Sequence, residues 1–519
     1  MKKLILLSFT LVLFINLSAQ VTYFDKLYGF EKLKNNTIYN NYSYKAIEFD
    51  SNFVLYYLSL RPSLTKFTNI LNVDKVTGNV ISQKIIGDSN IINQIFSLEK
   101  ISKTKDNNII CLGGLYKITG LDTIYQAILY KVKPNGDTIW TKSYKNKYTA
   151  DFNIRCLLPT NDGGFISGFC VFDYNSKTQN YSQYDFWILK TDSLGNKEWE
   201  KRIGNTNIND FEVKIAEAKD GYVMTGYKKK VGGEYLYGYV HKIDKIGNTI
   251  WQRDFEPNEY NNFFSSIIES KNGNYYLCGG TNETSGCIDQ QCNRARVLKI
   301  TDNGNILWDK KYLTSYTDTL TYYNEFYDME ELLNGDIIIA GTTSQTTIVG
   351  QASLIFKINS QGDSLWSRIY DKNNGIDYFS GVTPCKDNGF LFTGTALDTS
   401  AVAEGGYPIY KAWLLKTDSL GCSVPGCATD TPIEEIEQKV NLFELLPNPA
   451  TNYIKLNFKT SITGGLQIAD ITGKPMVSEK LLNVNSWETD ISKLSSGIYL
   501  VSVIDQNNVK STQRLVVMR

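Results

Sequence analysis

Near the start of five repeats along the chain, just before the predicted first strand, an acidic or amide residue is followed immediately by an aromatic one. The five polar positions are Asp151, Asp210, Asn262, Glu325 and Asp377. Oxygen atoms repeated around the mouth of a channel could bind a cation or accept hydrogen bonds from sugar hydroxyls. The same pairs also fit a turn-capping side chain followed by a core aromatic in every repeat. The regular recurrence favours this structural interpretation, and the binding role stays open as the alternative.

The chain offers few other groups for catalysis. Its single histidine, His241, lies in a predicted strand. No serine lies in a nucleophile motif, and neither a phosphate-binding loop nor a dinucleotide fingerprint occurs. One histidine and no paired CxxC motifs cannot supply a zinc site. The sequence therefore predicts no catalytic residues, no cofactor and no metal, although paired carboxylates remain possible because their separation depends on the fold.

A long repeat determines which elements position these residues. A glycine precedes a short apolar strand seven times, at intervals of roughly 52 to 59 residues, at Gly78, Gly136, Gly195, Gly247, Gly304, Gly362 and Gly421. Five of these glycines are followed four residues later by tryptophan, at Trp140, Trp199, Trp251, Trp308 and Trp366. Periodicity of this length indicates a solenoid, an array or a propeller. The tryptophans are expected to pack between neighbouring repeats.

Each repeat contains four strand signals, which in the fourth repeat cover 211–218, 221–227, 237–244 and 249–255. The last repeat ends near Gly421 without a fourth strand, and residues 21–29 resemble the missing segment. We therefore expect an all-β fold: a seven-bladed β-propeller of four-stranded blades over residues 20–427, closed by the N-terminal strand. Tight turns would lie on one face, and long, varied loops on the other, where binding is expected.

The first residues are typical of a secretory signal. Lys2 and Lys3 precede an apolar stretch over residues 4–15, and Ala19 is a small residue before Gln20. This pattern predicts a signal peptide over residues 1–19, cleaved between Ala19 and Gln20. No later segment is long and apolar enough to span a membrane. The 54 basic residues balance the 54 acidic ones, which argues against a nucleic-acid partner.

Export permits disulfides among the nine cysteines. Cys287 with Cys292, and Cys422 with Cys427, flank short loops and could each form a local bridge. Cys156 and Cys170 lie on consecutive predicted strands and could pair across a hairpin.

Residues 428–440 are polar and predict a linker, and a compact β pattern follows over 441–519. About seven short strands predict a small Ig-like sandwich. The segment resembles the type A sorting domain of the type IX secretion system through Pro447, Asn448 and Pro449, then Gly473 and Lys474, then Gly497 and Tyr499. The resemblance implies export through the type IX secretion machinery, a secreted or outer-surface location and a bacterium of the Bacteroidetes group. An ordinary Ig-like or carbohydrate-binding sandwich is the alternative.

The repeats resemble those of secreted bacterial propellers, including the quinoprotein-like class, whose Asp-x-x-Thr-Gly turn is matched most closely by Asp74 to Gly78. This likeness implies architecture and no activity. We expect a non-enzymatic binding or adhesion module with a glycan or protein ligand. A carboxylate-dependent glycan hydrolase or lyase, and a structural surface component, are the alternatives.

Overall fold

The computed structural model describes most of the chain. The described residues are 21–29, 40–60, 66–86, 94–119, 122–145, 151–175, 180–205, 207–255, 261–283, 292–312, 324–344, 351–372, 376–402, 408–425, 427, 442–470, 474–505 and 510–518. The predicted signal peptide with Ala19 and Gln20, Cys287, most of the long loops and the linker lie outside these residues. The chain divides into two compact units, residues 1–435 and 436–519.

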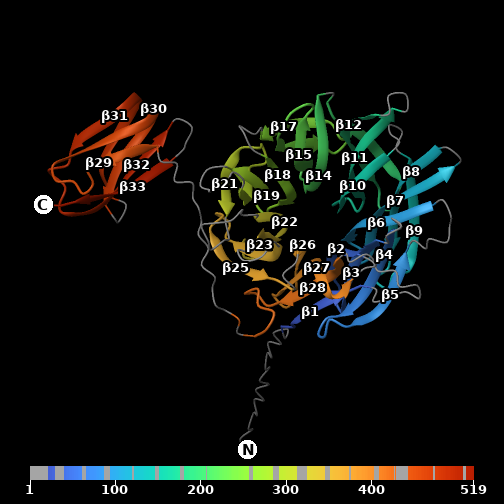
Figure 1. Ribbon diagram of the computed structural model, residues 1–519. Helices are drawn as coiled ribbons and strands as arrows, with labels where there is room; N and C mark the ends of the chain where they lie inside the picture. Colours follow the sequence, from blue (N-terminus) through green and yellow to red (C-terminus); the bar gives the residue numbers. More distant parts are fainter. Residues whose placement is uncertain are drawn as a thin grey trace, which may run out of the picture. The chain divides into compact units, whose positions relative to one another are not determined.

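Unit 1 contains seven antiparallel four-stranded sheets in its described part (Figure 1). Six sheets are continuous in sequence: β2 (Asn40–Glu48), β3 (Asn52–Leu60), β4 (Lys66–Asp74) and β5 (Val80–Ile86); β6 (Gln94–Lys103), β7 (Ile109–Thr119), β8 (Asp122–Val132) and β9 (Thr138–Lys145); β10 (Asp151–Pro159), β11 (Phe165–Asn175), β12 (Asn180–Thr191) and β13 (Lys197–Ile203); β14 (Ile208–Ala218), β15 (Gly221–Lys230), β16 (Leu236–Asp244) and β17 (Thr249–Phe255); β18 (Asn262–Glu269), β19 (Tyr275–Glu283), β20 (Cys292–Ile300) and β21 (Ile306–Tyr312); β22 (Asn324–Glu331), β23 (Ile337–Ser344), β24 (Gln351–Ile358) and β25 (Ser364–Tyr370).

The seventh sheet joins the two ends of unit 1. It contains β26 (Tyr378–Pro384), β27 (Phe390–Val402) and β28 (Pro408–Thr417), and its fourth strand is β1 (Phe24–Tyr28). Phe24 lies opposite Lys416 and Tyr28 opposite Ala412 in this antiparallel pair. The strand pairing predicted for residues 21–29 is therefore present. It covers the sheet edge that β28 would otherwise leave open.

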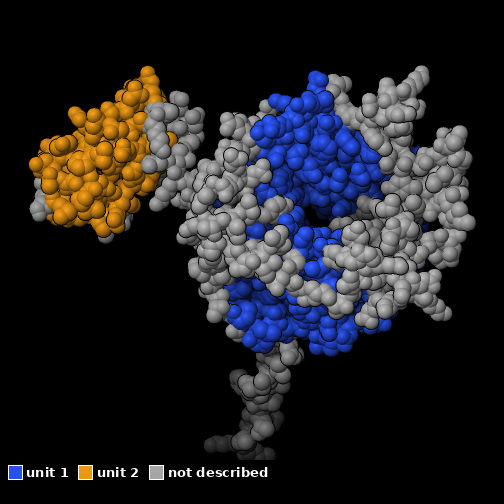
Figure 2. Space-filling view, viewed as in Figure 1, with its two compact units in different colours: residues 1–435 blue, residues 436–519 orange. Residues whose placement is uncertain are grey.

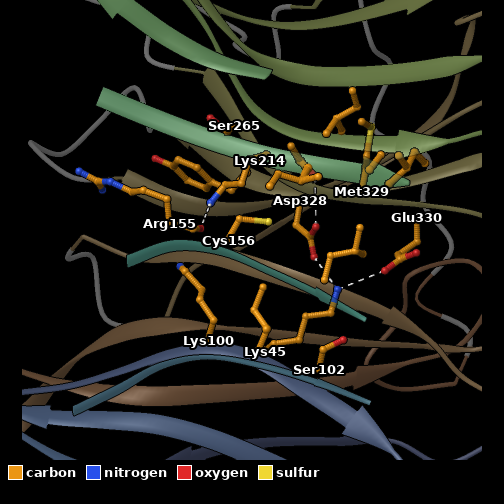
Figure 3. A pocket seen from close by; sticks show the side chains of 18 of the residues that line it. Lys45, Lys100, Ser102, Arg155, Cys156, Lys214, Ser265, Asp328, Met329 and Glu330 are labelled. Carbon is orange, nitrogen blue, oxygen red and sulfur yellow. Dashed lines mark hydrogen bonds and ion pairs between the residues drawn. The ribbon is translucent and has the colours of Figure 1, made fainter. Parts of the chain in front are cut away.

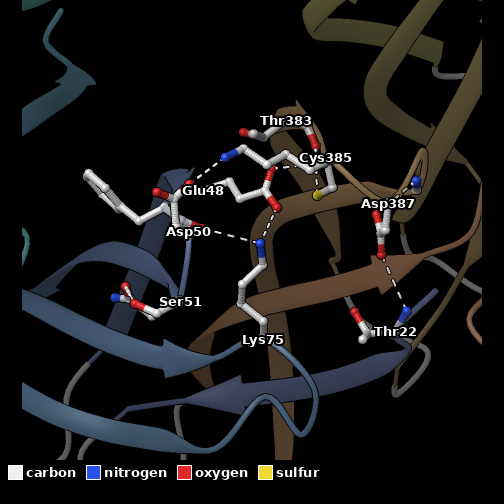
Figure 4. Close-up of polar contacts among 12 residues, drawn as sticks. Thr22, Glu48, Asp50, Ser51, Lys75, Thr383, Cys385 and Asp387 are labelled. Carbon is white, nitrogen blue, oxygen red and sulfur yellow. Dashed lines mark hydrogen bonds and ion pairs between the residues drawn. The ribbon is translucent and has the colours of Figure 1, made fainter. Parts of the chain in front are cut away.

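The first strands of the sheets follow one another around a central hollow. Each first strand contacts the first strand of the next sheet, from β2 through β6, β10, β14, β18 and β22 to β26, and β26 contacts β2 again. Figure 4 shows contacts between the first and seventh sheets. Thr383 donates to the carbonyl of Ala46 at 2.9 Å, and the Lys386 amide donates to Glu48 at 3.0 Å. The first and last sheets are thus direct neighbours.

The outer strands pack against the neighbouring sheet through the repeated tryptophans and glycines. All seven glycines of the repeat have φ between 69° and 85°, a conformation that glycine adopts without strain. A Cβ atom added to Gly304 would lie 2.9 Å from the Trp251 ring, and Gly195, Gly247, Gly362 and Gly421 face tryptophans in the same way. The prediction that these tryptophans pack between repeats is confirmed. At Gly78, the facing ring is that of Phe24 on β1.

Buried and half-buried lysines connect the third strands to the tight turns. Lys190 has a nearly buried side chain and lies 2.9 Å from both Asp162 and Glu198. Equivalent pairs join Lys131 to Asp106, Lys242 to Asp220, Lys357 to Asp336 and Lys416 to Asp387. Each pair ties a first-to-second-strand turn to the third strand of its own sheet.

Unit 2 contains one five-stranded sheet in its described part. The order is β29 (Phe443–Leu446), β30 (Tyr453–Asp470), β32 (Gly497–Asp505) and β33 (Lys510–Val517), and β31 (Pro475–Asp490) pairs with β30. The prediction of about seven short strands is wrong, because β30 and β31 are long strands whose pairing shifts register near Ile462. The unit has its own apolar core, which includes Phe443, Leu456, Ile468, Val501 and Leu515.

Five of the seven cysteines whose side chains the structure describes are free. Cys422 and Cys427 form a disulfide. Cys156 and Cys170, whose pairing the sequence left open, are both free and buried, so that hairpin bridge does not form. Cys170 instead donates to the carbonyl of Asp210 at 3.0 Å.

Candidate functional site

Two adjoining cavities occupy the hollow that the first strands enclose, and Figure 2 shows unit 1 hollowed there. Their volumes are about 470 Å³ and about 540 Å³. Six residues, one from each of β6, β10, β14, β18, β22 and β26, line both cavities: Lys100, Arg155, Lys214, Ser265, Tyr327 and Ser380. The cavities are therefore consecutive sections of one channel, and these six residues form its waist.

A register shift in each first strand determines which side chains reach the channel. The shifts occur at Ser43/Lys45, Leu98/Lys100, Ile154/Cys156, Asp210/Glu212, Phe264/Ser266, Phe326/Asp328 and Phe379/Gly381. A β-bulge leaves one residue unpaired and redirects its side chain. The unpaired residues Arg155, Ser265, Tyr327 and Ser380 all belong to the waist. The bulges thus bring polar side chains from separate sheets to one level of the channel.

Cationic side chains gather on one wall of the waist, carried by β6, β10 and β14 (Figure 3). Arg155 Nη1 lies 3.1 Å from Glu212, and Lys214 Nζ lies 3.0 Å from the same carboxylate. Burial alone would raise the pKa of Glu212, but the charges of Lys214, Arg155 and Lys100 hold it below its ordinary value. Glu212 is therefore ionised at neutral pH, and Arg155 and Lys214 share this carboxylate.

Carboxylates gather on the other side of the ring, on β22. Lys45 Nζ lies 3.3 Å from Asp328 and 3.1 Å from Glu330. Asp328 also accepts hydrogen bonds from Ser266 at 3.4 Å and from the Val382 amide at 3.1 Å. These contacts connect Asp328 to residues of β2, β18 and β26. The channel is therefore bipolar, with cations on the β6–β14 wall and carboxylates on β22.

The second cavity adds aromatic and amide side chains. It is lined by Tyr227, Phe263, Tyr327 and Tyr378 and by Asn261, Asn282 and Asn293. The ring centroids of Tyr227 and Phe263 are 6.2 Å apart, and those of Tyr327 and Tyr378 are 5.9 Å apart. All seven side chains are partly exposed. Flat apolar rings beside amide groups can contact both the faces and the hydroxyls of a sugar.

The five residues predicted to lie around the mouth of the channel differ in their hydrogen-bond partners and in their burial. The side chain of Asp151 lies outside the described residues. Asn262 accepts from the Gly238 amide at 2.8 Å and donates to the Phe255 carbonyl at 3.0 Å. Asp377 accepts from the Lys372 and Leu397 amides, at 2.8 Å and 3.0 Å.

Asp210 and Glu325 are both buried but differ in their access to the channel. Asp210 lies 3.8 Å from Lys228. Burial raises its pKa to about 7, with smaller contributions from Asp185 and Asp254. Glu325 accepts from the Tyr327 hydroxyl at 3.1 Å and lines the second cavity. Among the four described side chains, it is the one that lines either of these two cavities, and a ligand role for all five stays a prediction.

The channel cations were not identified from the sequence. Lys45, Lys100 and Lys214 occupy the same repeat position as Cys156, Ser266, Asp328 and Gly381, since each pairs with the equivalent residue of its second strand. This position varies between repeats and is often polar, whereas the residue after it stays apolar. That variation was the signal in the sequence that could have indicated a channel-lining position. Arg155 is instead the unpaired residue of a bulge, and a bulge leaves no local signature in the sequence.

The described residues also bear on metal binding and membrane insertion. Within the described ranges, no group of three or more His, Cys, Asp or Glu side chains is placed to hold a metal ion. No helix in the part of the chain that the structure describes is long and apolar enough to cross a membrane.

The predicted sorting residues that the structure describes make local contacts within unit 2. Asn448, between Pro447 and Pro449, donates to the Arg514 carbonyl at 2.6 Å and accepts from the Val516 amide at 2.9 Å. Tyr499 donates to the Ser495 carbonyl at 3.0 Å. The Lys474 amide donates to Asp470 at 3.1 Å, and Gly497 begins β32. Gly473 lies outside the described residues.

Comparison with known families identifies this unit. Residues 444–518 match the family described as "Secretion system C-terminal sorting domain". The chain thus carries a C-terminal sorting domain of the type IX secretion system, which directs it to secretion and the outer cell surface. The predicted location and the secretion machinery as a partner are supported by this match.

Solved structures similar to this chain share little sequence with it. One, a protein of unknown function from Dyadobacter fermentans, has 10% identity and a TM-score of 0.38, with 64% of this chain and 97% of that chain covered. A PL25 ulvan lyase has 10% identity and a TM-score of 0.42, covering 72% and 91%. A GH43 β-xylosidase/α-arabinofuranosidase from a compost microbial metagenome has 14% identity and a TM-score of 0.31, covering 55% and 98%. No curated protein matches the sequence.

Proposed function

We propose that the seven sheets are the blades of one closed β-propeller, exported through the type IX system, whose channel binds an extracellular glycan. The chain would comprise a signal peptide over residues 1–19, the propeller over 20–427, a linker over 428–440 and the sorting domain over 441–519. A Bacteroidetes origin and an Ig-like sandwich in unit 2 belong to the same proposal. The quinoprotein-like likeness rests on the turn from Asp74 to Gly78 and stays a prediction.

The observation that carries the binding proposal is the composition of the second cavity. Sugars are recognised by aromatic rings that cover their apolar faces and by amides and charged groups that exchange hydrogen bonds with their hydroxyls. The second cavity combines four aromatic rings with three asparagines and opens from the charged waist. Its volume of about 540 Å³ falls within the usual range for ligand pockets.

The ion pairing of the channel carboxylates and the raised pKa values of the channel tyrosines favour binding without turnover over catalysis. Glu212 is paired with two cations, and Asp328 and Glu330 are paired with Lys45. Burial raises the pKa of Tyr227 and of Tyr378, so neither phenol is readily deprotonated. A carboxylate-dependent hydrolase or lyase remains the alternative. Polysaccharide turnover that is lost in Asp328→Asn would establish it in place of the binding function.

A glycan array on the mature chain tests the proposal, followed by titration of any saccharide that binds. Tyr327→Ala should weaken binding about tenfold, which corresponds to roughly 1.4 kcal/mol. Tyr453→Ala removes an exposed tyrosine from unit 2 and is the matched control. An unchanged unfolding midpoint would show that the Tyr327 variant is folded. Equal binding by the two variants, or no saccharide bound by the wild type, would contradict the proposal and favour a structural role.

A further inference from the structure

The distribution of charge in the channel indicates what kind of glycan fits. Lys100, Arg155 and Lys214 come from three consecutive first strands and line both cavities. Arg155 and Lys214 both contact the carboxylate of Glu212. The three cationic side chains therefore place positive charge on this wall of the channel. A bound anion would add a second acceptor for these donors.

The other acidic residues of the channel have different neighbours. Asp328 and Glu330 pair with Lys45, and Glu325 accepts from Tyr327. At the tight-turn end, Glu217 accepts from the Asn161 amide at 2.6 Å, and Glu269 is exposed. Most of these acidic residues thus have partners of their own. The wall at Lys100, Arg155 and Lys214 is therefore the part of the channel suited to an anionic group.

We propose that the channel binds an acidic saccharide, whose carboxylate or sulfate is held by Lys100, Arg155 and Lys214. This inference rests on the glycan-binding function proposed above. The hydroxyls of the same sugar would donate to the carboxylates of Glu325 and Asp328 on β22. A saccharide with both an anionic group and hydroxyl donors matches the bipolar channel in one orientation. A peptide would match the charges but would not need the four aromatic rings.

The experiment compares charged saccharides with uncharged counterparts of the same backbone. The probes are oligogalacturonate beside its methyl ester, and a sulfated galactan oligosaccharide beside its desulfated form. Titration of the mature chain should show at least one acidic probe bound about tenfold more tightly than its counterpart, as expected for a charge-assisted contact. Rising salt should weaken that acidic probe selectively.

Two variants should shift this preference in opposite directions. Lys100→Gln should lower affinity for the acidic probe about tenfold and leave the neutral probe unchanged. Glu212→Gln removes the competing carboxylate and should raise affinity for the acidic probe. Lys142→Gln, on the outer strand β9, is the matched control because its side chain is exposed away from the channel.

Each outcome separates this inference from the general proposal. If saccharides bind but no acidic probe binds better than its neutral counterpart, the anionic specificity is wrong while glycan binding stands. If acidic peptides bind and no saccharide does, both proposals are wrong. If Lys100→Gln weakens the acidic and neutral probes equally, Lys100 does not recognise the charge, and the proposed anion site is overturned.

Discussion

The buried carboxyl of Asp210 makes the stability of unit 1 sensitive to pH. Its pKa is about 7 in the folded chain against an ordinary value of 3.8. Because the folded state holds this proton more tightly, stability should fall as pH rises from about 4 to about 7. A pKa difference of one between the folded and unfolded chains corresponds to about 1.4 kcal/mol, so Asp210→Asn should stabilise the chain at pH 8 by a few kcal/mol at most. Lys228 would keep its contact with Asp254, at 3.7 Å.

Urea unfolding at pH 5 and pH 8 measures this difference. Asp50→Asn is the matched control, since the Asp50 side chain is 82% exposed and its pairing with Lys386 is a surface contact. The Asp210 variant should lose part of the wild-type pH dependence, while the control keeps it. A pH dependence unaltered by Asp210→Asn would show that another group is responsible.

Residue roles could be predicted from sequence where they recur identically. The tryptophans and the glycines they face repeat with one geometry, so their packing followed from spacing alone. The charged waist could not be predicted, because Lys100, Arg155 and Lys214 lie on three strands distant in sequence, and Arg155 is the unpaired residue of a bulge. The acid and amide residues before the first strands were visible in the sequence, but their partners were not.

At the scale of elements, β1 completes the seventh sheet and helps to close the ring of neighbouring sheets. Phe24 occupies on β1 the place that tryptophan takes on the other outer strands, against Gly78 of the next sheet. The Tyr28 hydroxyl also donates to the Gly78 carbonyl at 2.6 Å, as Tyr144 does to Gly195 and Tyr312 to Gly362. The N-terminal strand thus repeats the contacts of an ordinary fourth strand, which explains why the sequence could predict its pairing.

Removing the Phe24 ring should weaken this closure. Phe24→Ala should destabilise unit 1 by about 3–5 kcal/mol, the usual effect of truncating a buried aromatic side chain. Val80→Ala, on the exposed outer strand β5, is the control and should cost far less. Thermal unfolding followed by near-UV circular dichroism measures both. Equal midpoints for the two variants would mean that β1 contributes little to the stability of the ring.

At the scale of the whole molecule, sequence and structure agree best on how the chain divides into a repeat unit and a sorting unit. The repeat predicted the sheets of unit 1, and the ordered motifs predicted the sorting function of unit 2. The number of strands in unit 2 was wrong, because β30 and β31 run through bends that sequence patterns divide into shorter pieces. The ligand of unit 1 could not be predicted, since the channel is assembled from seven separate first strands.

Hydrogen–deuterium exchange of the mature chain, with and without a bound acidic oligosaccharide, tests the central claim that the channel is the ligand site. Ligand should slow exchange at the bulges of β6, β10, β14 and β22. It should leave the outer strands β9, β13 and β17 and the sheet of unit 2 unchanged. Protection confined to outer strands or to unit 2 would place the ligand elsewhere and contradict the account.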